Sequence, residues 1–403
     1  MIYRYIVFGI LLWMSVLTAF SGERIIVVDS VSGEPLAKAS VLDRNGKPAG
    51  MTSDRGELPD LKPSSYPLTI HYIGYTPATV ARPDGDSRVR LSKMTLALPE
   101  VTVSVGKNEV LHLKGYVREY STLTSVTDTV TLFREKAVDF MIPTKKARRS
   151  FRGWSSPRLL ASRSYFRFTT RYGLDSVSDY YRQHFSWSDR VGVVDRVPMP
   201  LGLRRRSEAG DTVYGKYGVA SMWHRNGESV TLQADVLADS VNRKWVPDMD
   251  AFMHGSVDFN RFDIKISFDD IGESMLMAEN ISGISCNIDT KGRGWSLFQV
   301  FRHDEPFYVN TYAEIYITDR KYITTSQAKK LARLSGTTLG ADIVAPPEAP
   351  PLQPAVRELI ARVDSIDHDG QRTALRPDQR YMRTIPKIKE KNVLLNMLKR
   401  VWH

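Results

Sequence analysis

The sequence predicts a mainly β protein of the α+β class, with an N-terminal β-sandwich, a larger domain built on an antiparallel sheet, and a helical C-terminal tail. Two patterns support this prediction. Short β-rich runs separated by glycine, proline and asparagine turns fill the first hundred residues, and longer runs of alternating apolar and polar residues follow after residue 111. A chain of 403 residues is long enough for two or three domains.

The N-terminal segment predicts export. Residues 1–21 hold one cation, then an apolar run over residues 5–17, then Ala19 and Ser21 at the two positions that a signal peptidase reads. We therefore expect a cleaved signal peptide over residues 1–21 and a mature protein that begins near Gly22, in the periplasm or associated with the outer membrane. An uncleaved membrane anchor is the alternative, but it needs about 20 apolar residues.

Residues 22–105 have the pattern of a small β-sandwich. About seven short strands, such as "RIIVVD" and "LTIHYIGY", are separated by turn residues every 8 to 12 positions. A hairpin turn is expected at Asn45-Gly46, because both residues tolerate a positive φ.

This segment resembles the carboxypeptidase regulatory-like domain, a transthyretin-like module of exported proteins from Bacteroidetes-type bacteria. The resemblance covers "DSVSGEPLAKASVLDRNGKPAGMTSDRGELPDL" and "YPLTIHYIGYTP", about a fifth of the chain, and departs from the family pattern at Leu58-Pro59. The matching positions are Gly33, Pro35, Leu36, Ala39, Val41, Gly46, Thr52, Asp54, Gly56, Tyr66, Leu68, Ile70 and Tyr72–Tyr75. The resemblance implies an accessory domain without chemistry of its own.

The sequence contains no recognisable peptidase or metal motif, so no catalytic residue, cofactor or metal ligand is assigned. None of the eight histidines begins the His-x-x-Glu pair that zinc carboxypeptidases use. A stretch from Ser365 to Arg376 has the start of a calcium loop, but Arg376 stands where a bidentate glutamate is needed. The only cysteine, Cys286, lies in an alternating run, and we expect a buried structural thiol there instead of a nucleophile.

Residues 111–325 are expected to form a β-rich α+β domain. In "RFDIKISFDD" and "FYVNTYAEIYITDRKYIT" apolar residues alternate with polar ones, which predicts strands with one face on a core and the other on a polar medium. The spacing in "LFREKAVDFMI" and "SVSDYYRQHF" is compatible with helices. A half-barrel and a second sandwich both fit this pattern. Scattered tryptophans, among them Trp154, Trp187, Trp223, Trp245 and Trp295, are expected in the core more than on a glycan-stacking surface.

Residues 326–403 predict a helical tail. "TSQAKKLARLSG" has a helix cap and a terminating glycine, residues 345–354 form a proline-rich linker, and "AVRELIARVDSI" places Val356, Leu359, Ile360 and Val363 on one helical face. The last eighteen residues predict a basic amphipathic helix. That helix either docks on its own domain or makes peripheral contact with a membrane.

The excess of basic over acidic residues indicates which kinds of partner the protein is suited to bind. The chain carries 56 basic and 45 acidic residues, a net charge of +11, which suits anionic lipids or other acidic envelope polymers. Nucleic acid is not expected after export, and the basic clusters at Lys145–Arg149 and Arg204–Arg206 are interpreted as solvated loops.

The sequence thus favours a non-catalytic envelope protein that binds or assembles with an envelope protein, a lipid or a glycan. One alternative is an envelope hydrolase with a carboxylate site. Its candidate residues are Asp248, Asp250, Asp258, Asp269, Asp270 and Asp304. A second alternative is a relative of outer-membrane barrels, because "GYVREY" at Gly115–Tyr120 resembles a domain that follows the regulatory module in some outer-membrane proteins.

Overall fold

The computed structural model describes twelve stretches of the chain and divides it into two compact units. Of the described residues, 24–44 and 49–93 belong to one unit, and 45–48 together with those after residue 93 belong to the other. The predicted fold class is confirmed, because strands dominate both units and helices are few. The described residues are 24–82, 87–94, 109–173, 175–179, 186–204, 208–247, 257–272, 274–293, 305–334, 336, 342–347 and 349–366.

The smaller unit consists of short strands around one apolar core. β1 and β6 pair in parallel, and the other four strands form a sheet in the order β3-β2-β4-β5. Leu68 and Ile70 on β4 are fully buried in this core, as the alternation in the sequence requires. The strands are β1 (Ile25–Asp29), β2 (Ser40–Leu42), β3 (Pro48–Met51), β4 (Leu68–His71), β5 (Ala78–Val80) and β6 (Ser87–Leu91).

The "YIGY" segment that follows β4 is tied to the end of β1. The Tyr75 hydroxyl donates to Asp29 at 2.6 Å, and the backbone amides of Val31 and Ser32 donate to the other oxygen of that carboxylate. Burial opposes ionisation of Asp29, but these hydrogen bonds prevail and its pKa is lowered. The expected turn between β2 and β3 is also present, with Gly46 at a φ of +73°.

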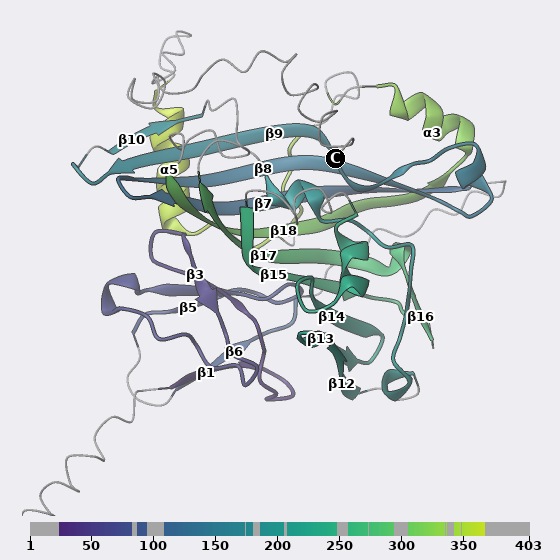
Figure 1. Ribbon diagram of the computed structural model, residues 1–403, viewed down its shortest axis with the longest axis horizontal. Coiled ribbons are helices and arrows are strands. Elements are labelled where there is room, and N and C mark those ends of the chain that lie inside the picture. Colours follow the sequence, from purple (N-terminus) through teal and green to yellow (C-terminus); the bar gives the residue numbers. More distant parts are fainter. Residues whose placement is uncertain are drawn as a thin grey trace, which may run out of the picture. The chain divides into compact units, whose positions relative to one another are not determined.

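The larger unit is built on one antiparallel sheet of ten strands (Figure 1). The strand order is β10-β9-β8-β7-β18-β17-β15-β14-β13-β12, with β10 and β12 at the edges. The strands are β7 (Val110–Ser125), β8 (Asp128–Pro143), β9 (Trp154–Thr170), β10 (Asp175–Ser178), β12 (Glu208–Gly215), β13 (Gly218–Asn226), β14 (Ser229–Asp235), β15 (Val257–Phe268), β17 (Ile281–Arg293) and β18 (Pro306–Ile323).

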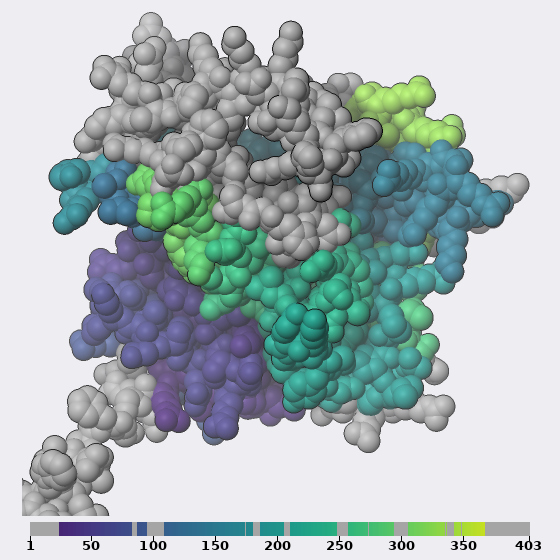
Figure 2. Space-filling view, viewed as in Figure 1, coloured from purple at the N-terminus to yellow at the C-terminus, as the bar shows by residue number. Residues whose placement is uncertain are grey.

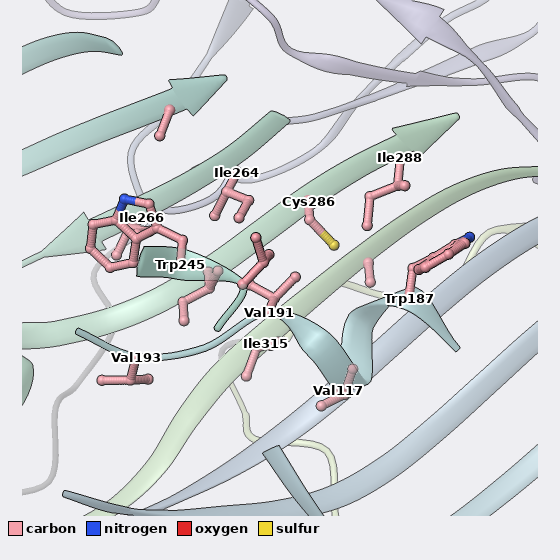
Figure 3. Packing of buried hydrophobic residues seen from close by; sticks show 14 of the residues in the cluster. Val117, Trp187, Val191, Val193, Trp245, Ile264, Ile266, Cys286, Ile288 and Ile315 are labelled. Carbon is pink, nitrogen blue, oxygen red and sulfur yellow. The ribbon is translucent and has the colours of Figure 1, made fainter. Parts of the chain in front are cut away.

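One face of this sheet is apolar and is covered by the protein's own connecting segments. Trp187, Val191 and Trp245 come from segments between strands and lie over isoleucines of β15 and β17 (Figure 3). Both tryptophans are fully buried, as expected of core residues, and a short pair of strands, β11 (Arg196–Pro198) and β16 (Met275–Met277), adds to this layer. Cys286 lies in the same core, where burial raises the pKa of its thiol to about 12, so this cysteine is structural.

The opposite face of the sheet is polar and aromatic, and its central part across β18, β7 and β8 is buried as well. Tyr312, Tyr120 and Phe133 stack in one row across β18, β7 and β8, with neighbouring ring centroids 6.0 and 5.2 Å apart. The Glu314 carboxylate accepts hydrogen bonds from the hydroxyls of Tyr312 and Tyr316. The expectation that these residues face a polar medium is therefore wrong, because this face holds an internal hydrogen-bond network.

The expectation of a helix in "LFREKAVDFMI" is also wrong. These residues form most of β8, which pairs with β7 on one side and with β9 on the other. Burial of both faces explains the error, because apolar residues then occur at odd and even positions and conceal the two-residue period. In "SVSDYYRQHF", residues 176–178 belong to β10, and residues 180–185 lie outside the described part of the chain.

Two described helices follow the sheet and belong to the same unit. α3 (Thr325–Ala332) begins at the predicted cap, where Thr324 and Gln327 form a capping box. α5 (Pro354–Asp364) buries Val356, Leu359 and Val363, as predicted, and contacts β9 and β10 (Figure 1). Within the described stretches, no helix combines the length and the apolar character needed to cross a bilayer.

The proline-rich segment before α5 contacts the polar face of the sheet. The Arg118 guanidinium donates to the carbonyl of Pro350, and Pro350 is buried. The linker is thus part of the folded unit in its described residues. The predicted signal peptide and the predicted C-terminal amphipathic helix both lie outside the described residues.

Candidate functional site

A pocket of about 330 Å³ lies between α3 and the polar face of the sheet. Its walls come from four neighbouring strands, from α3 and from the segment after α3, so residues far apart in the sequence meet here. Its volume is at the lower end of the range of about 300–1,000 Å³ that small-molecule sites occupy. The lining residues are His112, Lys114, Gly115, Tyr116, Ala137, Val138, Asp139, Arg158, Leu160, Thr318, Lys321, Leu331, Asp342 and Val344.

A hydrogen-bonded trio of side chains forms the most buried part of the pocket wall. Asp139 on β8 accepts from His112 Nε2 at 3.1 Å and from two guanidinium nitrogens of Arg158 at 2.8 and 2.6 Å. The Trp154 indole also donates to Asp139, and Arg158 stacks on the Trp154 ring at 4.4 Å from its centroid. Strand register explains why Asp139 and Arg158 lie together, because the two residues are directly paired across β8 and β9.

Hydrogen bonds and nearby charges determine the ionisation state of Asp139. Burial of Asp139 favours the neutral acid, but hydrogen bonds and positive charge from His112 and Arg158 prevail, so the pKa of Asp139 is lowered. A carboxylate only accepts hydrogen bonds, so His112 Nε2 must carry its hydrogen. The other ring nitrogen, Nδ1, is buried and has no partner among the described residues.

Cations stand at the rim of the pocket. Lys114 and Lys321 lie on adjacent strands and share one carboxylate, Asp319, at 3.6 and 3.7 Å. Both lysines are about half exposed, with relative side-chain accessibilities of 47% and 41%, and they exceed their shared partner by one positive charge. Leu331 and Val344 provide apolar wall, and Asp342 adds a second carboxylate to the lining, so the pocket combines apolar wall with a rim that carries both lysines and carboxylates.

A second polar cluster lies on the apolar face of the sheet. The Lys136 ammonium, only 1% exposed, contacts Glu119 at 2.8 Å, Ser186 at 2.6 Å, Ser188 at 2.9 Å and Asp189 at 2.7 Å. A serine beside a lysine is also found in hydrolases, but a nucleophile must reach its substrate. Here Ser186 and Ser188 are buried at 4% and 1% exposure, and Glu119 is fully buried, so we interpret the cluster as a structural ion pair.

The carboxylates considered for a hydrolase do not converge in the described part of the chain. Asp258 and Asp269 are eleven residues apart near opposite ends of β15, which corresponds to roughly 36 Å of extended chain. Asp269 accepts a hydrogen bond from Ser229, and Asp270 follows it with a φ of +52°. The other three candidates, Asp248, Asp250 and Asp304, lie outside the described residues.

Other sequence-based expectations fall partly outside the described chain. Lys145–Arg149 is described and forms a loop around η2 (Ala147–Arg149) whose four cations are exposed, whereas of the second basic cluster only Arg204 is described. Most of the calcium-like segment lies beyond residue 366. Among the described residues, no group of three or more histidine, cysteine or acidic side chains is arranged to hold a metal ion.

Sequence reasoning missed the trio in the pocket wall. Its members lie 27 and 19 residues apart, on three strands, and no motif connects them. One signal was available, because Asp139 stands in the apolar run "AVDFMI", and a buried carboxylate requires a partner.

No protein-family model and no curated protein matches this sequence. Several solved structures show weak similarity, and three of them illustrate it. A lipovitellin chain matches with a TM-score of 0.26 and 7% identity, over 55% of this chain and 26% of that chain. An outer membrane channel from Pseudomonas putida matches with a TM-score of 0.11 and 9% identity, over 54% of this chain and 100% of that chain. A β-porphyranase from Bacteroides plebeius matches with a TM-score of 0.10 and 8% identity, over 62% of this chain and 79% of that chain. This chain thus spans about a quarter of the length of the lipovitellin chain. With TM-scores this low, none of these similarities carries an argument.

The structural interpretation of the Lys136 cluster can be tested by stability. Glu119→Ala removes the fully buried one of the two carboxylates that pair with Lys136 and leaves only Asp189, which is 35% exposed. We expect the free energy of unfolding to fall by about 3–5 kcal/mol in chemical denaturation. The double variant Glu119→Leu with Lys136→Met removes both charges and should recover most of that loss. A double variant no more stable than Glu119→Ala would contradict this interpretation.

The state of Asp139 predicts a pH dependence. Because its pKa in the folded protein lies below the ordinary value of 3.8, the ionised Asp139 stabilises the fold above that pH, and this stability is lost as pH falls through the folded pKa. The difference in unfolding free energy between the wild type and Asp139→Asn should therefore shrink as pH drops below about 4. Asp60→Asn, at an exposed carboxylate, is the control. A difference that stays constant down to the acid limit would argue against an ionised Asp139.

Proposed function

We propose that this chain is a non-catalytic binding protein of the cell envelope and that the pocket beside α3 holds its ligand. The observation that carries the proposal is the combination of apolar wall, from Leu160, Leu331 and Val344, with two half-exposed lysines, Lys114 and Lys321, at the rim. Such a pocket is suited to an amphiphile with one anionic group. A lipid-like ligand therefore fits better than a glycan or a protein.

The arrangement of the trio supports binding over catalysis. A general base must reach the proton that it removes. His112 is only 4% exposed, its Nδ1 is closed off from solvent, and its Nε2 is engaged by Asp139. Arg158 is held by the same carboxylate and also donates to backbone carbonyls at the end of α3, at Leu331 and Leu334. These contacts fix α3 against the sheet and keep the pocket formed.

The envelope location is proposed from the sequence. Residues 1–21 have the composition of a signal peptide, and the smaller unit carries the residues that resemble the carboxypeptidase regulatory-like domain. By that resemblance, the smaller unit is an accessory element and the larger unit does the binding.

Calorimetric titration with decanoate tests the pocket. We expect decanoate to bind the full chain and decanol, which lacks the charge, to bind at least tenfold more weakly. Val344 is 69% exposed on the pocket wall, so its substitution should not disturb folding. Val344→Glu places a negative charge at the pocket, which costs roughly 2 kcal/mol at about 8 Å and an effective dielectric constant of about 20, before screening. It should weaken decanoate binding about tenfold.

Val344→Lys is the matched control, because it has similar bulk and the opposite charge. It should leave decanoate binding unchanged or tighten it. Equal losses in both variants, or a wild-type protein that binds decanol as tightly as decanoate, would contradict an anionic ligand in this pocket.

A further inference from the structure

The larger unit carries a basic surface made of two segments. Residues 144–153, which connect β8 to β9, contribute five cations, and residues 325–334, which contain α3, contribute three. All eight side chains belong to exposed residues. They are Lys145, Lys146, Arg148, Arg149, Arg152, Lys329, Lys330 and Arg333.

A small apolar cluster holds the two segments together. Ala147 from the β8–β9 connection and Ala328 from α3 are buried in the same cluster, with Phe151 and Leu331 packed against it. In Figure 2 the yellow-green atoms of α3 adjoin blue atoms of the β7–β9 region. The cations therefore surround a fixed apolar centre and project from one end of the sheet.

The local charge is strongly positive. Neither segment contains an acidic residue. Two carboxylates approach from elsewhere, Glu109 at 4.0 Å from Lys146 and Asp195 at 3.6 Å from Arg148. Eight cations less these two carboxylates leave an excess of six positive charges.

We propose that this basic surface docks the protein on an anionic phospholipid bilayer. Each lysine or arginine near such a bilayer strengthens binding by about fivefold, so a set of this size is sufficient without a membrane-spanning segment. The basic surface lies outside the ligand pocket, and its attraction to an anionic partner does not depend on the pocket. The choice of a bilayer over an acidic polymer rests on the proposed function.

The adjoining pocket favours a lipid bilayer over an acidic polysaccharide. Leu331 belongs both to the apolar cluster under the basic surface and to the wall of the pocket. An amphiphile taken from a bilayer that contacts this surface would thus meet the pocket at the same end of the sheet. An acidic polymer offers the charge but no apolar chain.

Co-sedimentation of the full chain with vesicles tests the proposal. We expect binding to vesicles that contain phosphatidylglycerol, loss of binding in high salt, and no binding to pure phosphatidylcholine. The variant Lys145→Gln, Arg149→Gln, Lys330→Gln removes three exposed cations and should lower partitioning roughly 100-fold.

The matched control is Arg55→Gln, Lys62→Gln, Arg82→Gln, which removes three exposed cations from the smaller unit and gives the same net charge. It should bind vesicles within about twofold of the wild type, and thermal melting should be the same for all three proteins. Equal losses in both triple variants would show that overall charge, and not this surface, drives binding. Binding to alginate without binding to phosphatidylglycerol vesicles would assign the surface to an acidic polymer and overturn the proposal.

Discussion

The antiparallel pairing of three long strands, β7, β8 and β18, is the constraint on which the larger unit depends. Each has at least 16 residues, and their registers run almost unbroken from one end of the sheet to the other. Because side chains alternate between faces, this register assigns every residue to one of two layers. One layer is the apolar core under Trp187 and Trp245, and the other is the aromatic network around Glu314. The pocket trio also depends on the pairing of β8 with β9, which places Asp139 opposite Arg158.

Local patterns in the sequence predicted much of the architecture. The alternation in "RFDIKISFDD" marks β15, whose Phe262, Ile264 and Ile266 are fully buried. The cap at Thr324 and the apolar stripe at Val356 locate α3 and α5, because both signals arise within a few residues. The misreading of β8 has the opposite origin. Both faces of β8 are buried by parts of the chain that are distant in the sequence. The sequence of β8 alone therefore does not show that both faces are buried.

The candidate site was less accessible to sequence reasoning. The basic cluster at Lys145–Arg149 was visible, but its neighbour across the apolar cluster, α3, lies almost 180 residues further on, at Thr325–Ala332. Likewise, residues of four strands line the pocket, and the composition of the sequence does not show how these strands pair. Polar residues inside apolar runs, such as Asp139 and Lys136, are unused signals of buried networks. Which partners they find is decided by strand register.

One end of the sheet therefore combines three features that act together. Arg158 ties α3 to β8 and β9, α3 closes the pocket, and the cations of α3 join those of the β8–β9 connection. Hydrogen–deuterium exchange of the full chain with phosphatidylglycerol vesicles tests this account most directly. It predicts new protection in residues 144–153 and 325–334, with little change in β12 and β13 at the other edge of the sheet. Protection spread evenly over the chain, or confined to regions away from α3, would contradict it.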